Sequence, residues 1–239
     1  MKIEILFPEV CNQYGDFSNV IYLRQSFKDA EFHYCALHEE PYFVKNDVDM
    51  IYIGSLAEKY QKMVAEQLRP HKMRLWKLIE NNTVVLVTGN AADLFGRYIM
   101  QNGEKVEGIG LFDYHVIQDK EHRNNSQFVG RFEDIMITGL KSNFSNPAGN
   151  FGTPLFEIVR GHGNNGKDEE EGIRYNNCFI TYLLGPLLPQ NPLFLKRIME
   201  ILHYDGKPAF EKEAMEAYER RLAQMSAPGV HTDLNYHGV

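Results

Sequence analysis

Short apolar runs alternate with longer amphipathic segments through the N-terminal part of the chain. The amphipathic segments, residues 16–29 and 55–80, carry apolar side chains at helical spacing, and Pro70 breaks the second one near its middle. The apolar runs predict four strands, over residues 3–7, 31–36, 50–54 and 83–87. Helices that alternate with strands in this way predict a mostly parallel sheet with helices on both faces.

The pattern changes in the second half of the chain. Residues 149–174 are rich in glycine, asparagine and acidic residues, which predicts a long loop with one strand over residues 155–159. The Gly185-Pro186 pair ends a further apolar strand over residues 178–183. Antiparallel strands are expected over residues 112–120, 128–134 and 135–139.

Two amphipathic segments close the chain and predict helices over residues 192–203 and 208–225. Residues 227–239 lack such a pattern and are expected to form a loose tail. No segment has the composition of a linker between domains. We therefore expect a single domain over residues 1–239.

The segment that bears most directly on function is a strand–turn–helix corner. The predicted strand over residues 83–87 runs into Thr88, Gly89 and Asn90, and a helix is expected over residues 91–96. In α/β enzymes a nucleophile sits on such a corner and faces a helix N-terminus that stabilises an oxyanion. Neither Thr88 nor Gly89 is a ready nucleophile, and the sequence leaves open which of the two lies at the apex.

Three loops follow the carboxyl ends of predicted parallel strands. They cover residues 9–17, 54–57 and 88–91. Ligands of open α/β sheets bind outside this edge of the sheet, so we expect a crevice where the three loops meet.

Composition and charge exclude several classes of protein. A net charge of −7 argues against general binding to nucleic acids or anionic membranes. Cys11, Cys35 and Cys178 do not have the number or spacing of a disulfide framework or a zinc site, and the sequence has no P-loop. We therefore expect no metal and no cofactor. The chain starts directly with a strand and has no apolar stretch long enough to span a membrane, so a cytoplasmic location is expected.

Six stretches along the chain form a recognisable series of motifs. They are N-Q-Y-G-D-F-S-N at residues 12–19, Ile53-Gly54, the corner at residues 88–96, E-G-I-G-L-F-D at residues 107–113, G-H-G-N-N at residues 161–165 with E-G-I-R-Y at residues 171–175, and T-Y-L-L-G-P-L-L-P at residues 181–189. Together they resemble the GatD-type glutamine amidotransferase subunit of lipid II isoglutaminyl synthase, within the CobB/CobQ-like class I amidotransferases. The resemblance implies a flavodoxin-like or Rossmann-like fold of three layers, with a mostly parallel central sheet and antiparallel additions in the second half.

The departures from the family pattern fall where the chemistry takes place. The family's C-G-G-Y-Q-x-L-G corner aligns with residues 89–96, so its cysteine position is Gly89 and its glutamine position is Asp93. The histidine of its T-Y-L-H-G motif is Leu184, and its G-G-G oxyanion loop reads Gly54-Ser55-Leu56. Glutamine hydrolysis in this class needs a thiolate and a histidine that moves the proton. Since glycine and leucine provide neither, the residues argue against the family's activity.

The resemblance also places a set of residues at the former glutamine crevice. They are Tyr14, Asp16, Asn19, Gly54, Ser55, Asn90, Asn143, His162 and Tyr182. The loop that holds His162 is rich in glycine and asparagine, so ordinary turn chemistry explains it equally well.

Three hypotheses about function follow. The first is a catalytically degenerate binding or regulatory subunit whose partner, by resemblance, is a MurT-like synthetase related to the Mur ligases, in a cell-wall or cobalamin-type pathway. The second is an active amidotransferase or other hydrolase with a relocated nucleophile, Thr88 or Cys11, served by Asp16 or His162 as a base. The third is a stand-alone protein that binds a small molecule in the former glutamine crevice.

Overall fold

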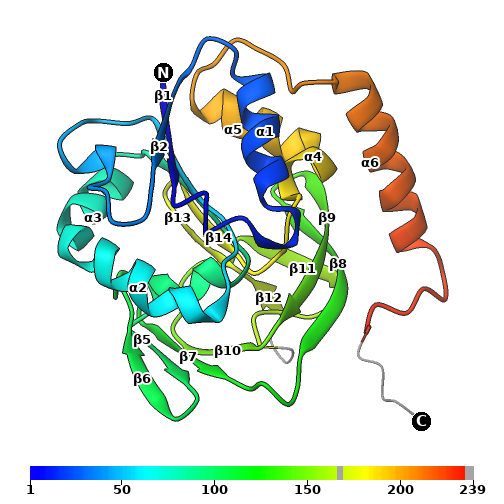
Figure 1. The fold of residues 1–239 in the computed structure, drawn as a ribbon. Helices are drawn as coiled ribbons and strands as arrows, with labels where there is room; N and C mark the ends of the chain where they lie inside the picture. Colours follow the sequence, from blue (N-terminus) through cyan, green and yellow to red (C-terminus); the bar gives the residue numbers. More distant parts are fainter. Residues whose placement is uncertain (166–168, 235–239) are drawn as a thin grey trace.

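A six-stranded sheet runs through the middle of the molecule (Figure 1). The computed structural model describes residues 1–165 and 169–234. The strand order is β13-β14-β4-β3-β1-β2, and the strands are β1 (Lys2–Leu6), β2 (Glu31–Cys35), β3 (Met50–Ile53), β4 (Val84–Thr88), β13 (Ile173–Tyr175) and β14 (Cys178–Thr181). All neighbouring pairs are parallel except β13 with β14. This arrangement confirms the predicted parallel sheet.

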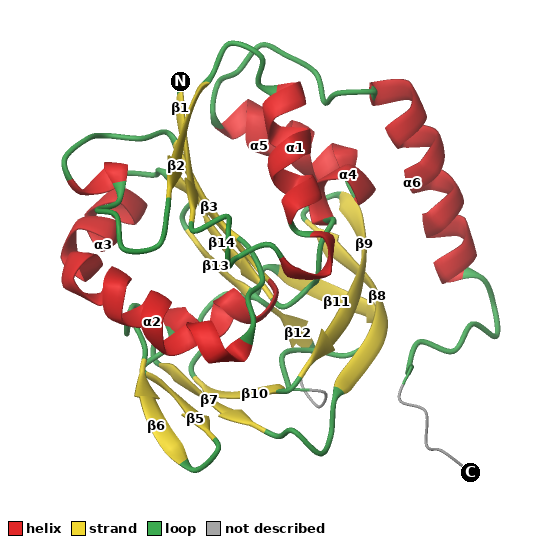
Figure 2. Cartoon of the chain, in the orientation of Figure 1, coloured by secondary structure: helices red, strands yellow, loops and turns green. Residues whose placement is uncertain are grey.

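Helices cover both faces of the central sheet, as expected (Figure 2). On one face lie α1 (Phe17–Ser26), α4 (Leu187–Gln190) and α5 (Pro192–Ile201), whose apolar residues form one buried cluster with that face. On the other face lie α2 (Glu58–Leu68) and α3 (Lys72–Glu80), which belong to a second cluster. Pro70 lies in the single 3₁₀ turn that separates α2 from α3, so the predicted break is confirmed.

Two smaller sheets flank the central one. One has the order β12-β11-β8-β9 and contains the long hairpin of the second half, with β8 (Asn124–Phe132), β9 (Ile135–Asn143), β11 (Phe156–Arg160) and β12 (Glu170–Glu171). The other has the order β10-β7-β5-β6, with β5 (Tyr98–Gln101), β6 (Glu104–Glu107), β7 (Tyr114–Gln118) and β10 (Ser145–Gly149). The expected antiparallel pairing is confirmed for β8 with β9, whereas β7 pairs parallel with β5 and antiparallel with β10.

The hairpin of β5 and β6 was not predicted. Its turn is Asn102-Gly103, and both residues have positive φ, of 52° and 79°. An Asn-Gly pair between two short runs is a strong hairpin signal, because both residues tolerate the left-handed conformation that a tight turn needs. The signal was present in the sequence, but three of the four residues of β6 are exposed, so the alternation around it is weak.

The prediction of an α-helix-like segment over residues 91–96 is wrong about the type of helix. The segment is a 3₁₀ helix, η4 (Gly89–Phe95). The backbone carbonyls of Leu94 and Phe95 accept hydrogen bonds from Ile109 and Leu111, which come from the segment before β7. Because these acceptors are taken by another segment, the turn does not propagate into an α-helix.

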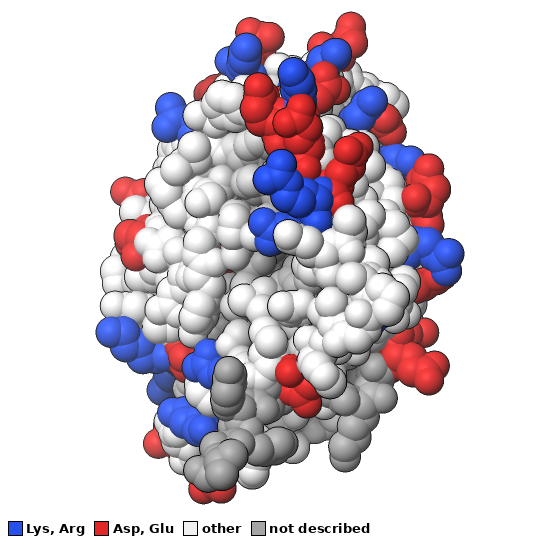
Figure 3. Space-filling model, turned by 90° about the vertical axis from the view of Figure 1, so that its right-hand side faces the viewer, with Lys and Arg blue, Asp and Glu red and all other residues white. Residues whose placement is uncertain are grey.

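The last helix lies beside β8 and β9 at the edge of the molecule. In α6 (Glu211–Ser226) only Tyr218 is buried, and its hydroxyl donates to the carbonyl of Met136 in β9 at 2.8 Å. Figure 3 shows charged side chains of both signs running from the top to the middle of this side of the molecule and along its margins, with uncharged areas on either side of that band. Of the predicted tail, Thr232 and Leu234 hydrogen-bond to the backbone of β8, and residues 235–239 lie outside the described part of the chain.

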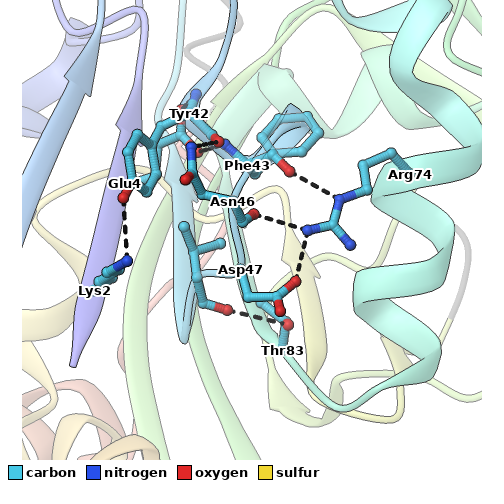
Figure 4. Close-up of polar contacts among 9 residues, drawn as sticks. Lys2, Glu4, Tyr42, Phe43, Asn46, Asp47, Arg74 and Thr83 are labelled. Carbon is cyan, nitrogen blue, oxygen red and sulfur yellow. Dashed lines mark hydrogen bonds and ion pairs between the residues drawn. The ribbon is translucent and has the colours of Figure 1, made fainter.

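A buried carboxylate fixes the connection between β2 and β3. Glu4 in β1 is fully buried, and its carboxylate accepts the backbone N–H groups of Tyr42 and Phe43 at 2.6 and 2.8 Å (Figure 4). Arg74 of α3 donates to the carbonyl of Phe43 at 2.9 Å and to the carboxylate of Asp47 at 2.7 Å. Burial raises the pKa of Glu4. These contacts hold the 3₁₀ turn η2 (Tyr42–Val44) against the sheet, at a distance from the corner.

None of the helices in the described ranges is both long and apolar enough to cross a membrane.

Candidate functional site

The corner after β4 is built around Gly89. Gly89 has φ +60°, and its N–H donates to the carbonyl of Leu183 at 3.0 Å, whereas Thr88 has the extended conformation of a strand. A left-handed residue directly after a strand is the strained geometry of a nucleophile elbow. The backbone therefore gives position 89 the apex geometry that the sequence left open between Thr88 and Gly89.

No room remains for a side chain on Gly89. A Cβ atom built on this residue would overlap the hydroxyl oxygen of Ser55, lie 2.9 Å from the Ser55 Cβ and lie 3.4 Å from the Leu184 Cδ2. Ser55 and Leu184 are both buried. The hydroxyl of Ser55 thus occupies the space that a nucleophilic side chain at position 89 would need.

Asp16 lies beneath the corner, and we call the hydrogen-bonded residues around its carboxylate the floor of the site. Its carboxylate accepts hydrogen bonds from the Ser55 N–H, from the Thr88 hydroxyl at 3.1 Å and from the Asn19 amide at 3.1 Å. Burial raises the pKa of Asp16 to about 6, although hydrogen bonds from Ser55, Thr88 and Tyr52 stabilise the charged form and oppose the shift. The Thr88 hydroxyl also lies 3.1 Å from the Tyr52 hydroxyl, so its polar contacts are to the floor and not to the crevice.

Asn90 joins the corner to the loop after β3. Its side-chain oxygen accepts the N–H of Leu56 at 3.0 Å, and its amide donates to the carbonyl of Leu56 at 2.7 Å. On the other side of this loop, a Cβ on Gly54 would lie 2.7 Å from the carbonyl oxygen of Cys11. The three predicted loops therefore meet at one place, and a close backbone approach requires glycine at position 54.

A narrow crevice opens above the corner. It has no room for even a water molecule, whereas small-molecule sites usually have volumes of roughly 300–1,000 Å³. Its lining residues come from both halves of the chain: Tyr14, Glu58, Asn90, Arg123, Ser142, Asn143, Phe144 and Leu184. A larger groove beside the carboxyl end of α1, lined by residues 204 and 206–211 among others, is far from the corner chemistry and contains none of the predicted site residues.

Two crevice residues have polar groups that face it. The side-chain nitrogen and oxygen of Asn143 are both buried and find no hydrogen-bond partner within the described part of the chain. Arg123 lies with its guanidinium 4.1 Å from the centre of the Phe144 ring and donates to the Ser142 hydroxyl at 3.0 Å. Arg123 and Glu58 were not predicted from the sequence, because both lie in polar segments without a motif.

Other predicted residues lie outside the crevice lining. His162 hydrogen-bonds through Nδ1 to the side chain of Asn124 at 2.7 Å, on the side of β8. Cys11 is buried, and burial raises the pKa of its thiol well above the usual range. Asn19 lies under the floor, where its side-chain oxygen accepts the N–H of Leu188 at 2.8 Å. Tyr182 is buried beside Asp93.

Asp93 forms a second buried carboxylate, below the corner. Its Oδ2 accepts hydrogen bonds from the Ser145 hydroxyl at 2.7 Å and from the Gln61 amide at 2.9 Å, while Oδ1 has no partner among the described residues. Burial raises the pKa of Asp93 to about 6 from 3.8, and the interactions with Ser145, Gln61 and Tyr182 oppose the shift.

Because its pKa is raised in the folded state, Asp93 costs stability when it is ionised. Between about pH 6 and pH 4 the folded protein holds a proton on Asp93, whereas the unfolded chain has already lost it. The contribution of Asp93 to the free energy of unfolding therefore increases as the pH falls through this range. We expect Asp93→Asn to increase the free energy of unfolding by about 1–3 kcal/mol at pH 8 and to leave it nearly unchanged at pH 4. The amide keeps the accepting oxygen and adds a donor beside Tyr182.

Urea denaturation of the wild type and Asp93→Asn at the two pH values measures this difference. Asp205→Asn, at an exposed position, serves as the matched control. Destabilisation by Asp93→Asn at pH 8 would contradict the assignment of a costly buried charge.

Comparisons with known proteins identify the family to which the chain belongs. The model of the CobB/CobQ-like glutamine amidotransferase domain matches residues 2–192. The chain is 30% identical over 184 residues to the GatD subunit of lipid II isoglutaminyl synthase (glutamine-hydrolyzing) of Staphylococcus aureus, covering 75% of each protein. It is 27% identical over 214 residues to the Streptococcus pneumoniae subunit of the same name, covering 83% of this chain and 79% of that protein.

Solved structures support the fold. PurLQS from Thermotoga maritima superposes with a TM-score of 0.54 at 11% identity, over 92% of this chain and 98% of that chain. A crystal structure of a glutamine amidotransferase superposes with a TM-score of 0.53 at 13% identity, over 84% of this chain and 98% of that chain. The predicted three-layer fold with a mostly parallel central sheet is thereby confirmed. From the matched residues 2–192 and the GatD relatives together, the chain belongs to the CobB/CobQ-like glutamine amidotransferase family.

Proposed function

We propose that this chain is a non-hydrolytic subunit of the GatD type. Its partner is a MurT-like synthetase related to the Mur ligases, and the complex amidates lipid II in peptidoglycan synthesis. The relatives in Staphylococcus aureus and Streptococcus pneumoniae are named as subunits of lipid II isoglutaminyl synthase, and this supports both the pathway and the subunit role.

One observation carries the non-hydrolytic part of the proposal. At position 89 the backbone keeps the elbow geometry, but the residue has no side chain, and the hydroxyl of Ser55 fills the space beside it. The glutamine-hydrolysing reaction needs a thiolate that attacks the side-chain amide. A cysteine could not be accommodated here without moving Ser55. The packing around position 89 therefore fits a chain that has no nucleophile there.

The proton carrier is also absent. Leu184 packs beside Gly89, where the family motif has histidine, and an alkyl side chain cannot take a proton from a nucleophile or give one to the leaving ammonia. Removing either member of such a pair typically lowers kcat by several orders of magnitude. The loss of both leaves binding as the remaining role.

The structure gives little support to a relocated nucleophile. The Thr88 hydroxyl is buried and hydrogen-bonded to Asp16 and Tyr52, and the Cys11 thiol is buried with a raised pKa. A thiol in that state is mostly protonated near neutral pH and reacts slowly. A stand-alone small-molecule receptor is likewise disfavoured, because the crevice has no room for even a water molecule.

Amidation by the reconstituted complex tests the proposal. The chain is co-expressed with its MurT-like synthetase, and amidation of lipid II is measured with either glutamine or ammonium as the nitrogen source. We expect a stable complex that uses ammonium and fails to use glutamine. The GatD subunit of Staphylococcus aureus with its own partner is the control for glutamine use. Failure of the two chains to associate, or amidation driven by glutamine, would overturn the proposal.

A further inference from the structure

One edge of the central sheet is open. The sheet ends at β2, whose five residues pair only with β1, in one continuous register from Glu31 to Cys35. The strand at the opposite edge, β13, has three residues and is partly covered, because Arg174 forms a β-bridge with Thr153. An uncovered edge strand presents a row of free backbone groups to which another strand can pair.

The backbone groups of Phe32 and Tyr34 face this open edge. At the two ends of β2, the N–H of Glu31 and the carbonyl of Cys35 hydrogen-bond on the β1 side, at 2.9 and 2.8 Å. Alternate residues of a strand direct their backbone groups to opposite sides, so Phe32 and Tyr34 direct theirs outward. Within the described part of the chain, neither residue makes a backbone hydrogen bond on that side.

The usual protection of a free edge is absent from β2. Natural edge strands often carry a lysine, a proline or a bulge that prevents pairing with another chain. In β2 the two residues with outward backbone groups are aromatic, and the register with β1 has no shift. Tyr34 leaves 42% of its surface exposed, so the edge is accessible. A strand of this kind is suited to receive another strand.

The strand is complementary to a second copy of itself. In an antiparallel pair with a two-fold axis at His33, Phe32 of each copy lies opposite Tyr34 of the other. Each of these pairs exchanges two backbone hydrogen bonds, so every outward group of Phe32 and Tyr34 gains a partner. The same arrangement places aromatic side chains directly opposite each other, which stabilises antiparallel pairs.

The charges near the ends of β2 favour the antiparallel arrangement. Glu9 and Glu39 lie at the carboxyl end, where their carboxylates accept backbone N–H groups of the turn after β2. Lys28 and Asp29 precede the amino end and balance each other in charge. An antiparallel pair keeps the two acidic ends apart and brings Lys28 of each copy toward Glu39 of the other. A parallel pair would place the two acidic ends together, which is unfavourable.

We propose that two copies of the chain associate through β2, antiparallel and about a two-fold axis at His33, and so join their central sheets into one. The corner follows β4, which is separated from β2 by β3 and β1. The contact is therefore independent of the proposed function. One pair of short strands makes a small interface, so the association is weak and depends on concentration.

Sedimentation velocity of the purified chain between about 1 and 200 µM tests the dimer. We expect monomer at the low end and an increasing fraction of dimer toward the high end. Tyr34→Lys puts a charge on the open edge and should weaken self-association at least about tenfold. Tyr175→Lys is the matched control, because Tyr175 is an exposed tyrosine of β13 at the other edge of the sheet. It should self-associate like the wild type.

A cysteine in place of His33 tests the register. At the two-fold axis this position lies opposite itself in a non-hydrogen-bonded pair, where the Cα atoms are about 4.5 Å apart and a disulfide can form. We expect His33→Cys to give a disulfide-linked dimer under mild oxidation. The wild type is the control, because its own three cysteines are buried.

Three results would overturn the dimer and leave the proposed function untouched. The first is a chain that stays monomeric over the whole range of concentration. The second is a dimer that Tyr34→Lys does not weaken or that His33→Cys does not cross-link, since the contact would then lie elsewhere. The third is a monomeric chain whose binding to the synthetase is weakened by Tyr34→Lys, which would assign the edge to that partner. Circular dichroism confirms that each variant is folded.

Discussion

Gly89→Ala is expected to lower the free energy of unfolding by about 2–5 kcal/mol. A residue other than glycine at φ +60° costs about 1–2 kcal/mol, and forcing an atom into a filled site costs about 1–3 kcal/mol more. The added Cβ overlaps the Ser55 hydroxyl and lies 2.9 Å from the Ser55 Cβ. Urea denaturation of purified variants measures the change.

A second substitution separates the two causes. With Ser55→Gly in the same chain, the overlap disappears while the backbone strain remains, so the double variant should be less destabilised than the sum of the single changes by about 1–3 kcal/mol. Gly103→Ala is the control for strain alone, because Gly103 has φ +79° and open space around it. Additive effects at positions 55 and 89 would contradict the claim that Ser55 fills the nucleophile's space.

Lys141→Met is expected to destabilise the protein by about 3–5 kcal/mol, because it leaves a buried charge without its partner. Lys141 in β9 is fully buried, and its ammonium group donates to the carbonyls of Gly163 and Asn164 and lies 5.3 Å from the centre of the Tyr182 ring. Burial raises the pKa of Glu171, and the charge of Lys141 opposes that shift. Without the lysine, the buried Glu171, which accepts hydrogen bonds from Thr181 and Tyr182, must either stay charged without a nearby positive charge or take up a proton.

A double variant that combines Lys141→Met with Glu171→Gln tests this cause. The carboxamide introduced at position 171 keeps an oxygen that can accept the N–H of Tyr182, to which Glu171 bonds at 2.7 Å, and it has no charge to compensate. We expect the double variant to recover at least half of the lost stability in urea denaturation. Lys120→Met, at an exposed position, is the control. A Lys141→Met variant within about 1 kcal/mol of the wild type would exclude a strong role for the pair.

Much of the fold could be predicted because its signals are local. The apolar runs of the parallel strands and the amphipathic helices between them repeat with clear periods, and Pro70 marks its own break. The corner was located for the same reason, since β4 is buried along its whole length and ends in a glycine turn. The type of helix that follows the corner depends on hydrogen bonds from residues 109–112. No pattern in the local sequence reveals these bonds.

The site needed three-dimensional information. Ser55 and Gly89 are far apart in the sequence, and only the packing of two loops reveals that the hydroxyl of one takes the space of a side chain on the other. Arg123 enters the crevice from the start of a polar hairpin, where a charged residue normally indicates a solvated surface. The sequence alone shows that the nucleophile is missing. It does not show that Ser55 and Leu184 pack against the position where the nucleophile would lie.

The release of glutamate from glutamine by the purified chain, alone and with the MurT-like synthetase, is the most direct test of the central claim. Thr88→Ala and Cys11→Ala are assayed beside the wild type. We expect no release above background in any of these samples, because Gly89 and Leu184 provide neither a nucleophile nor a proton carrier. Clear turnover that one of the two substitutions abolishes would show that the chain hydrolyses glutamine and would identify a relocated nucleophile.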